Sequence, residues 1–173
     1  MNETCKLDIQ IDVNPLYGLN LPLYKTIARH QKHSSEQAKS HDRLPIDILA
    51  IPSRRTRDYI LDQIPNGVLQ VEVPELSILE VTVPLNSKSP VIGAHVDLGR
   101  IAVFNYYMET NGEITSFPED SFIAEDGDMY LMDVTKVHTV SLVPGTRRRI
   151  LSMSFYRADF ETLRRICASK ICK

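Results

Sequence analysis

The chain has 173 residues, of which 43% are hydrophobic and 24% charged, and its formal net charge is −2. This composition excludes a disordered chain, and the charge gives no overall attraction to nucleic-acid phosphate. The length fits a single domain with a sizeable core. Because no apolar run reaches the roughly 18 residues of a membrane span and the first ten residues lack signal-peptide character, we expect a cytoplasmic protein without a membrane partner.

The cysteines and the basic runs give weak signals. Cys5, Cys167 and Cys172 are too few for a disulfide framework and lack the CxxC spacing of a zinc or redox site, so we expect reduced thiols. Arginines cluster at residues 53–57 and 147–149. These runs keep nucleic acid open as a partner without indicating it.

We expect residues 1–67 to form a helical support. The segment PLYKTIARHQKHSSEQAK, from Pro22, carries little β signal, and a proline suits the first turn of a helix. A second helix is predicted from Ser53 as its N-cap through RRTRDYILDQI, with PNG at residues 65–67 ending it.

Residues 68–157 are predicted to form a β-barrel core. They are a succession of short runs rich in β-branched and aromatic residues, separated by Pro, Asn, Gly and Asp. The pair Asn111-Gly112 is typical of a two-residue hairpin turn, which would make the strands at 100–109 and 113–117 antiparallel neighbours. The runs are VLQVEV, LSILEVTVPL, VIGAHV, GRIAVFNYYME, EITSF, DMYLMDV, KVHTVSLV and RRRILSMSFY.

Residues 158–173 are predicted to form a C-terminal helix, because Phe160, Leu163 and Cys167 recur at helical spacing. The whole chain, 1–173, then reads as one mainly β domain with flanking helices. Many short strands joined by turns favour a sandwich or barrel of the jelly-roll, cupin-like kind. Such a barrel can hold a ligand in its mouth.

Three residues on predicted strands form a candidate metal site. His95 and Asp97 are two positions apart, so they share one face of a strand, and His138 lies on a later strand between valines. Two imidazoles and one carboxylate on one face of an ion leave coordination positions open at ferrous iron. The same pattern also arises by chance, and a histidine on an apolar strand is commonly a hydrogen-bonded core residue.

An arginine beyond His138 would complete a site for a dicarboxylate co-substrate, because a guanidinium grips a carboxylate through two hydrogen bonds. The run at 147–149 offers three candidates. Strand alternation places Arg148 on the side of Ser152 and Ser154, and its two neighbours on the other side. If the small polar residues face the cavity, Arg148 is the binder and the other two face solvent or a carboxylate.

In this order, HVD at 95–97, EDGDMYLMDVTKVHTV at 125–140 and RRRILSMSF at 147–155, the motifs resemble those of the iron(II) and 2-oxoglutarate-dependent oxygenases. The likeness covers about residues 68–157. It implies a double-stranded β-helix, Fe(II) bound by the histidines and aspartate, and 2-oxoglutarate bound by an arginine. It also implies dioxygen as a reactant, succinate and CO2 as products, and hydroxylation of a substrate. The arginine choice stays open between Arg148 and Arg149, with Arg100 as an outside candidate.

Other residues carry weaker signals. Asn105 and Tyr107 share the parity of a cavity-facing set, and Tyr107 could hydrogen-bond 2-oxoglutarate or simply be a buried tyrosine with a nearby acceptor. His30 and His33 have the spacing of a helical metal pair, but a solvated helix face explains them better. Asp133 could orient a ligand or close a turn.

The sequence leaves the substrate and the oligomeric state open. An amino acid, a peptide or a protein side chain is the first substrate class, and a nucleotide or nucleobase the second. A different class of protein also fits: a cupin-like binding protein whose barrel holds zinc or no metal. A zinc hydrolase fits less well because no glutamate is placed beside the three ligands as a general base.

Overall fold

The structure is a computed structural model that describes residues 3–27 and 44–172. The helices are η1 Asn14–Leu16, α1 Arg54–Leu61, α2 Asn66–Val71, α3 Phe160–Ile166 and η3 Ala168–Lys170. The strands are β1 Thr4–Leu7, β2 Leu23–Ile27, β3 Ile46–Ala50, β4 Glu75–Thr82, β5 Val91–His95, β6 Ala102–Glu109, β7 Ile114–Ser116, β8 Ser121–Ile123, β9 Met129–Met132, β10 His138–Ser141 and β11 Arg147–Phe155.

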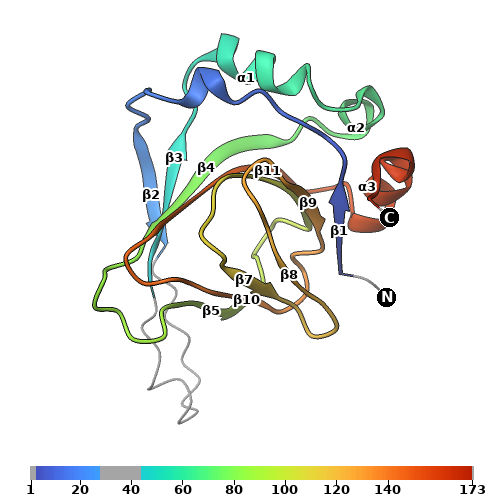
Figure 1. The fold of residues 1–173 in the computed structure, drawn as a ribbon. Helices are drawn as coiled ribbons and strands as arrows, with labels where there is room; N and C mark the ends of the chain where they lie inside the picture. Colours follow the sequence, from blue (N-terminus) through green and yellow to red (C-terminus); the bar gives the residue numbers. More distant parts are fainter. Residues whose placement is uncertain (1–2, 28–43, 173) are drawn as a thin grey trace.

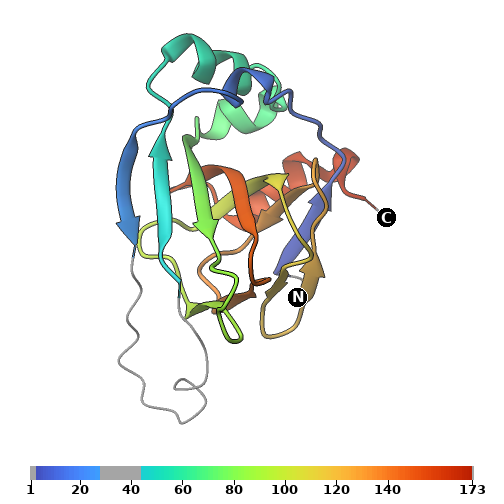
Figure 2. The same ribbon diagram turned by 60° about the vertical axis from the view of Figure 1, so that its left-hand side comes forward.

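The strands form two antiparallel sheets that face each other (Figures 1 and 2). The major sheet has the order β1-β9-β6-β11-β4-β3-β2, and the minor sheet has the order β5-β10-β7-β8. From β4 onward the chain passes back and forth between the sheets, so that strands distant in sequence pair within each one. This winding defines a double-stranded β-helix and confirms the expected mainly β jelly-roll core.

The expectation that residues 1–67 form only a helical support is wrong. This segment supplies β1, which pairs with β9, and the antiparallel pair β2 and β3, which extends the major sheet beyond β4. The helix expected from Pro22 is wrong for Leu23–Ile27, and the rest of that segment lies outside the described residues. Pairing with β3 overrides the weak local preference of the segment, as the hydrogen bond from Thr26 Oγ1 to Asp47 Oδ1, 2.6 Å, illustrates.

The helix predicted from Ser53 is confirmed as α1. Ser53 Oγ accepts a hydrogen bond from the Thr56 backbone N–H at 3.2 Å, and Ile60 is fully buried. The strand expected at 68–73 is wrong, because these residues lie mostly in α2, where Pro65 precedes the first turn and Val68 is buried. Among the described helices, none has the length and apolar character needed to span a membrane.

The hairpin expected at Asn111-Gly112 is also wrong. Gly112 does adopt a positive φ of 86°, but Asn111 does not, so the two-residue turn of a tight hairpin is not formed. The Asn111 side-chain amide donates to the Arg147 carbonyl at 2.8 Å, and the chain then crosses to the other sheet. As a result β6 pairs with β9 and β11, whereas β7 pairs with β10 and with the unpredicted β8.

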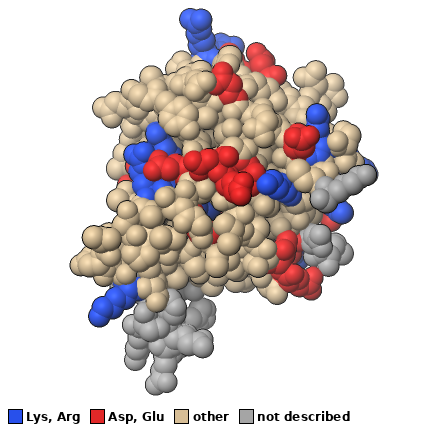
Figure 3. Space-filling view, in the orientation of Figure 1, with Lys and Arg blue, Asp and Glu red and all other residues tan. Residues whose placement is uncertain are grey.

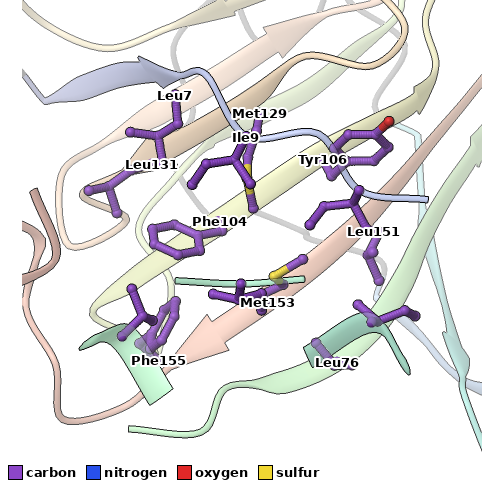
Figure 4. Packing of buried hydrophobic residues seen from close by; sticks show 14 of the residues in the cluster. Leu7, Ile9, Leu76, Phe104, Tyr106, Met129, Leu131, Leu151, Met153 and Phe155 are labelled. Atoms are coloured by element: carbon purple, nitrogen blue, oxygen red, sulfur yellow. The ribbon is translucent and has the colours of Figure 1, made fainter. Parts of the chain in front are cut away.

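The major sheet has a buried apolar cluster on each of its two faces. Its outer face carries the largest apolar cluster, which is covered by residues 7–21 and by the helices (Figure 4). The predicted helix α3 packs here through Phe160, Leu163 and Cys167, all buried, and the three cysteines are free thiols as expected. The inner face points toward the minor sheet and carries a smaller apolar cluster together with several buried polar residues.

Candidate metal centre and co-substrate pocket

The three residues of the candidate metal site meet at one point. His95 is the last residue of β5 and His138 is the first residue of β10, and the two are direct cross-strand partners in the minor sheet. Their ring centroids lie 4.2 Å apart. Asp97 follows β5, and one ligand atom from each of the three residues lies within 4.8 Å of the others. The side chains therefore form a ligand set of the size that one metal ion requires.

Backbone carbonyl groups fix both imidazole rings. His95 Nδ1 lies 2.6 Å from the Gly93 oxygen, and His138 Nδ1 lies 3.0 Å from the Lys136 oxygen. Because a carbonyl only accepts hydrogen bonds, each Nδ1 carries a proton, and in the neutral ring Nε2 then carries the lone pair that a metal requires. His95 Nε2 points to Asp97 Oδ1 at 3.7 Å. This tautomer and this orientation are those of metal-binding histidines.

Phe117 holds the second imidazole from the side. Its ring stacks on that of His138 with centroids 5.2 Å apart and an angle of 20° between the planes. His138 and Asp97 are 8% and 7% exposed. No sequence pattern indicates this role for Phe117, because it lies just after the short strand β7 and contacts a residue from a different strand, β10.

The carboxylate of Asp97 has a cationic partner on its other side. Arg100 Nη2 donates to Asp97 Oδ2 at 2.5 Å, and Arg100 Nη1 donates to Ser154 Oγ at 3.1 Å and to Ser152 Oγ at 3.4 Å. The guanidinium of Arg100, the outside candidate for binding 2-oxoglutarate, thus already contacts the carboxylate of the candidate metal ligand Asp97. The spacing of three residues from Asp97 is the only sequence signal that could have indicated this pair.

The three arginines at 147–149 point alternately to the two faces of β11, as strand alternation predicts. Arg147 donates to Glu109 Oε2 at 2.7 Å, and Arg149 Nε lies 3.4 Å from Glu80 Oε2. Arg148 is 6% exposed, points to the inner face, and makes no ion pair with the described residues. The Nε atoms of Arg148 and Arg149 are both buried without a hydrogen-bond partner in residues 3–27 and 44–172, so the two arginines differ in the Glu80 carboxylate that lies next to Arg149. The binding role of Arg148, and the alternative of Arg149, remain predictions.

Tyr107 lies beside Arg148 on the inner face, and Asn105 lies on the same face opposite Ser152. Both are buried on β6, and the Arg148 guanidinium lies 5.4 Å from the centre of the Tyr107 ring. Burial raises the pKa of Tyr107, and the neighbouring Arg148 cation opposes this rise without reversing it. Asn105 Oδ1 is buried and has no hydrogen-bond partner in the part of the chain that the structure describes. The Arg148 cation and the Tyr107 ring are thus buried side by side.

The residues present fit Fe(II) and 2-oxoglutarate. Two imidazole nitrogens and one carboxylate oxygen are the ligand set of non-haem iron oxygenases, although zinc accepts the same donors. Buried polar atoms are normally hydrogen-bonded, and the unpaired Arg148 Nε and Tyr107 hydroxyl are donors that a carboxylate between the sheets would satisfy. A carboxylate would satisfy the guanidinium.

A cleft of about 580 Å³ opens beside the metal site. It reaches from Asp97 and Arg100 along β2, β3 and β4 to the end of α1, so the unpredicted N-terminal strands build one of its walls. Its lining includes apolar side chains from these elements and from the loop after β5, namely Ile27, Ile48, Ala50, Ile51, Leu61, Val73, Leu76, Leu79 and Leu98.

No protein-family model matches the chain, and no curated protein matches it by sequence. Solved structures similar to it include a Pseudomonas putida prolyl-4-hydroxylase, with 16% identity over 70% of this chain and 80% of that one, at a TM-score of 0.46. A 2OG-Fe(II) oxygenase family oxidoreductase from Burkholderia pseudomallei shows 12% identity over 81% and 75% of the two chains, at a TM-score of 0.45.

A predicted oxalate decarboxylase from Thermotoga maritima also matches, with 12% identity over 65% of this chain and 81% of that one, at a TM-score of 0.41. Similarities as low as these establish neither an activity nor a ligand for this chain. We therefore infer its function from the geometry of the site.

Proposed function

We propose that the protein is an Fe(II)- and 2-oxoglutarate-dependent dioxygenase that hydroxylates an amino acid, a peptide or a protein side chain. One observation carries the proposal: the cluster of His95, Asp97 and His138 lies at the mouth of a barrel that also buries Arg148 without an ion pair among the described residues. A metal site alone fits many proteins. The additional buried cation favours a metal enzyme that also binds a dicarboxylate.

Each residue has a defined task in this proposal. His95, Asp97 and His138 would hold the iron, and Arg148 would bind the far carboxylate of 2-oxoglutarate through charge-assisted hydrogen bonds. The Tyr107 hydroxyl and the Asn105 side-chain N–H2 group would donate further hydrogen bonds to the same co-substrate. When bound, the iron would supply the coupled reaction in which dioxygen oxidises 2-oxoglutarate to succinate and CO2 and gives one oxygen atom to a substrate C–H bond.

Apolar side chains surround the buried part of the site. Phe117 covers one imidazole, and Val103, Tyr130, Met132 and Ile150 belong to the apolar cluster of the inner face, where Arg148 also lies. Burial strengthens the bond between the Arg148 cation and a carboxylate, because less water competes for either group. The protein's contribution would therefore be positioning and partial exclusion of water.

The cleft supports an uncharged substrate group. Its charged side chains are largely engaged within the protein: Arg57 donates to the Ile51 carbonyl at 3.0 Å, and Glu75 accepts from the Tyr156 hydroxyl at 2.7 Å. On the face shown in Figure 3, a row of acidic side chains is flanked by basic ones. This mixture of charge favours an amino acid or peptide over the phosphates of a nucleotide.

The test is oxygen-dependent succinate formation. Protein loaded anaerobically with Fe(II) and 2-oxoglutarate is exposed to oxygen, with and without a panel of amino acids and peptides, and succinate is measured. We expect succinate above the level of an Asp97→Ala variant, and a substrate that gains one oxygen atom in mass. Arg147→Ala, which changes a surface arginine, is the matched control and should retain activity. Equal succinate from wild type and Asp97→Ala would overturn the proposal in favour of a binding protein.

A further inference from the structure

We propose that Arg100 is a positioning residue that makes Asp97 a metal ligand through one oxygen only and thereby keeps a coordination position open. The inference rests on the metal site of the proposed function and adds a role to a residue outside the ligand set. The two oxygens of the Asp97 carboxylate have different partners. Oδ1 faces the imidazole of His95, whereas Oδ2 receives the Arg100 Nη2 hydrogen bond at 2.5 Å.

A tight turn brings the guanidinium back onto the carboxylate. Gly99 adopts a φ of 92°, a conformation that other residues rarely adopt, and this lets the side chain three positions after Asp97 fold toward it. The Asp97 backbone N–H donates to the Val134 carbonyl at 3.0 Å, which ties the turn to the loop before β10. Backbone and side chain of Asp97 are therefore both held.

The opposite sheet anchors the guanidinium. Arg100 Nη1 donates to Ser154 and Ser152, which lie on β11, the central strand of the major sheet. One arm of the planar fork therefore contacts the aspartate while the other contacts the far side of the barrel. A lysine could not make both contacts in this fixed geometry, because its ammonium group is a single point at the end of a flexible chain.

The consequence concerns the number of open positions on the metal. A carboxylate binds a metal through one oxygen or through both. With one oxygen from Asp97, the three protein residues would supply three ligands to the ion and would leave room for a co-substrate bound through two oxygens and for dioxygen. If Asp97 bound through both oxygens, one of these reactants would lose its position. By engaging Oδ2, Arg100 prevents this.

The experiment uses Mn(II) as an inert probe and counts the water molecules on the bound ion by their effect on water-proton relaxation. We expect Arg100→Met to lower this relaxation effect by about a third, as two exchangeable waters replace three. We also expect the dissociation constant of 2-oxoglutarate for the Mn(II) protein to rise about 10-fold, the usual size of effects from residues that orient metal ligands. Neither readout depends on turnover.

Two further variants separate positioning from general damage. Arg147→Met removes a surface arginine that also pairs with a carboxylate, and it should change neither readout. The double variant Ser152→Ala, Ser154→Ala keeps the Arg100–Asp97 pair but removes its anchors, so it should shift both readouts in the same direction by less. If Arg100→Met does not fold, as judged by circular dichroism, this double variant decides the question.

The outcomes are distinct. If wild-type protein binds no Mn(II), the proposed metal centre and this inference both fall. If wild-type protein binds Mn(II) and 2-oxoglutarate, and the folded Arg100→Met protein gives the same relaxation effect and the same 2-oxoglutarate affinity, the proposed function stands and only the role of Arg100 is refuted.

Discussion

The two faces of the major sheet are built from the same strands but serve different purposes. On β6, Phe104 and Tyr106 point outward into the large apolar cluster, whereas Asn105 and Tyr107 point inward. On β11 the outward residues are Leu151, Met153 and Phe155, and the inward residues include Arg148, Ser152 and Ser154. The outer face is thus packed with apolar side chains, while the inner face also buries polar groups.

This difference bears on the source of stability and on the proposed binding site. Apolar burial on the outer face supplies favourable free energy and needs no ligand. The polar groups of the inner face are costly to bury, and three of their atoms, Asn105 Oδ1, the Tyr107 hydroxyl and Arg148 Nε, have no hydrogen-bond partner within residues 3–27 and 44–172. We infer that the outer face stabilises the barrel strongly enough to tolerate a binding site on the inner face.

The largest expected effect comes from breaking the outer face. Phe104 is fully buried, and its ring packs edge-on against that of Phe155 with centroids 5.1 Å apart. Phe104→Ala should lower the free energy of unfolding by about 3–5 kcal/mol, because the cavity it leaves cannot collapse completely. Urea unfolding followed by circular dichroism measures the change. A loss below about 1 kcal/mol would mean that this face is not the main source of stability.

The inner face should respond in binding instead of stability. Arg148→Ala is expected to weaken 2-oxoglutarate binding to the Mn(II) protein by about 1.5–3 kcal/mol, since a charge-assisted hydrogen bond to a buried carboxylate is lost. Unfolding free energy should change little, because the arginine is buried without an ion pair recorded for it in the described chain. Calorimetric titration gives the affinity. Arg149→Ala is the matched control, and an equal effect of the two substitutions would refute the choice of Arg148.

Glu72 offers a contrast to the unpaired polar groups of the inner face, because it is a buried carboxylate that accepts several hydrogen bonds. Its carboxylate accepts from the backbone N–H groups of Tyr156, Arg157 and Ala158 at 2.8–3.0 Å. Burial alone would raise the pKa of Glu72, but these hydrogen bonds outweigh it and lower the pKa below its ordinary value. Glu72→Gln should therefore cost stability, about 1–2 kcal/mol at neutral pH.

The direction of the pKa shift of Glu72 determines how its contribution to stability changes with pH. Because the folded-state pKa of Glu72 is lowered, its stabilisation is complete above the unfolded-state pKa and is lost as the pH falls through the folded-state pKa. The difference between wild type and Glu72→Gln should accordingly shrink in acid. Unfolding curves at a series of pH values measure it, and a difference that stays constant from neutral pH to pH values below the folded-state pKa would contradict the assignment.

The smallest expected effect is that of Tyr107→Phe. The substitution removes one hydroxyl from the inner pocket and leaves the ring that packs beside Arg148. Binding of 2-oxoglutarate to the Mn(II) protein should weaken by about 0.5–1.5 kcal/mol, the net value of one hydrogen bond. Unchanged affinity would assign Tyr107 to packing alone. Tyr130→Phe, on the neighbouring strand β9, serves as the control.

Local patterns predicted much of this molecule. Strand alternation separated Arg148 from its neighbours, and the N-cap at Ser53 predicted α1. His95 and His138 could be suggested as partners from their residue types and predicted strands, but their direct pairing across β5 and β10 follows from the topology, which the sequence alone did not specify.

The errors occurred where tertiary pairing overrides local preference. The strand Leu23–Ile27 forms because β3 is beside it, and the turn at Asn111-Gly112 carries the chain to the other sheet although the dipeptide favours a hairpin. The cleft wall built by β2 and β3 was missed for the same reason. Contacts such as Phe117 on His138 join distant segments and leave no periodic signal.

The most direct test of the central claim is a crystal structure of the protein grown anaerobically with Fe(II) and 2-oxoglutarate, with diffraction measured at the iron absorption edge. Our account predicts an anomalous peak bonded to His95 Nε2, Asp97 Oδ1 and His138 Nε2, and a 2-oxoglutarate carboxylate on the Arg148 guanidinium. A peak elsewhere, or 2-oxoglutarate bound away from Arg148, would contradict the claim that the inner face of the barrel is an oxygenase site.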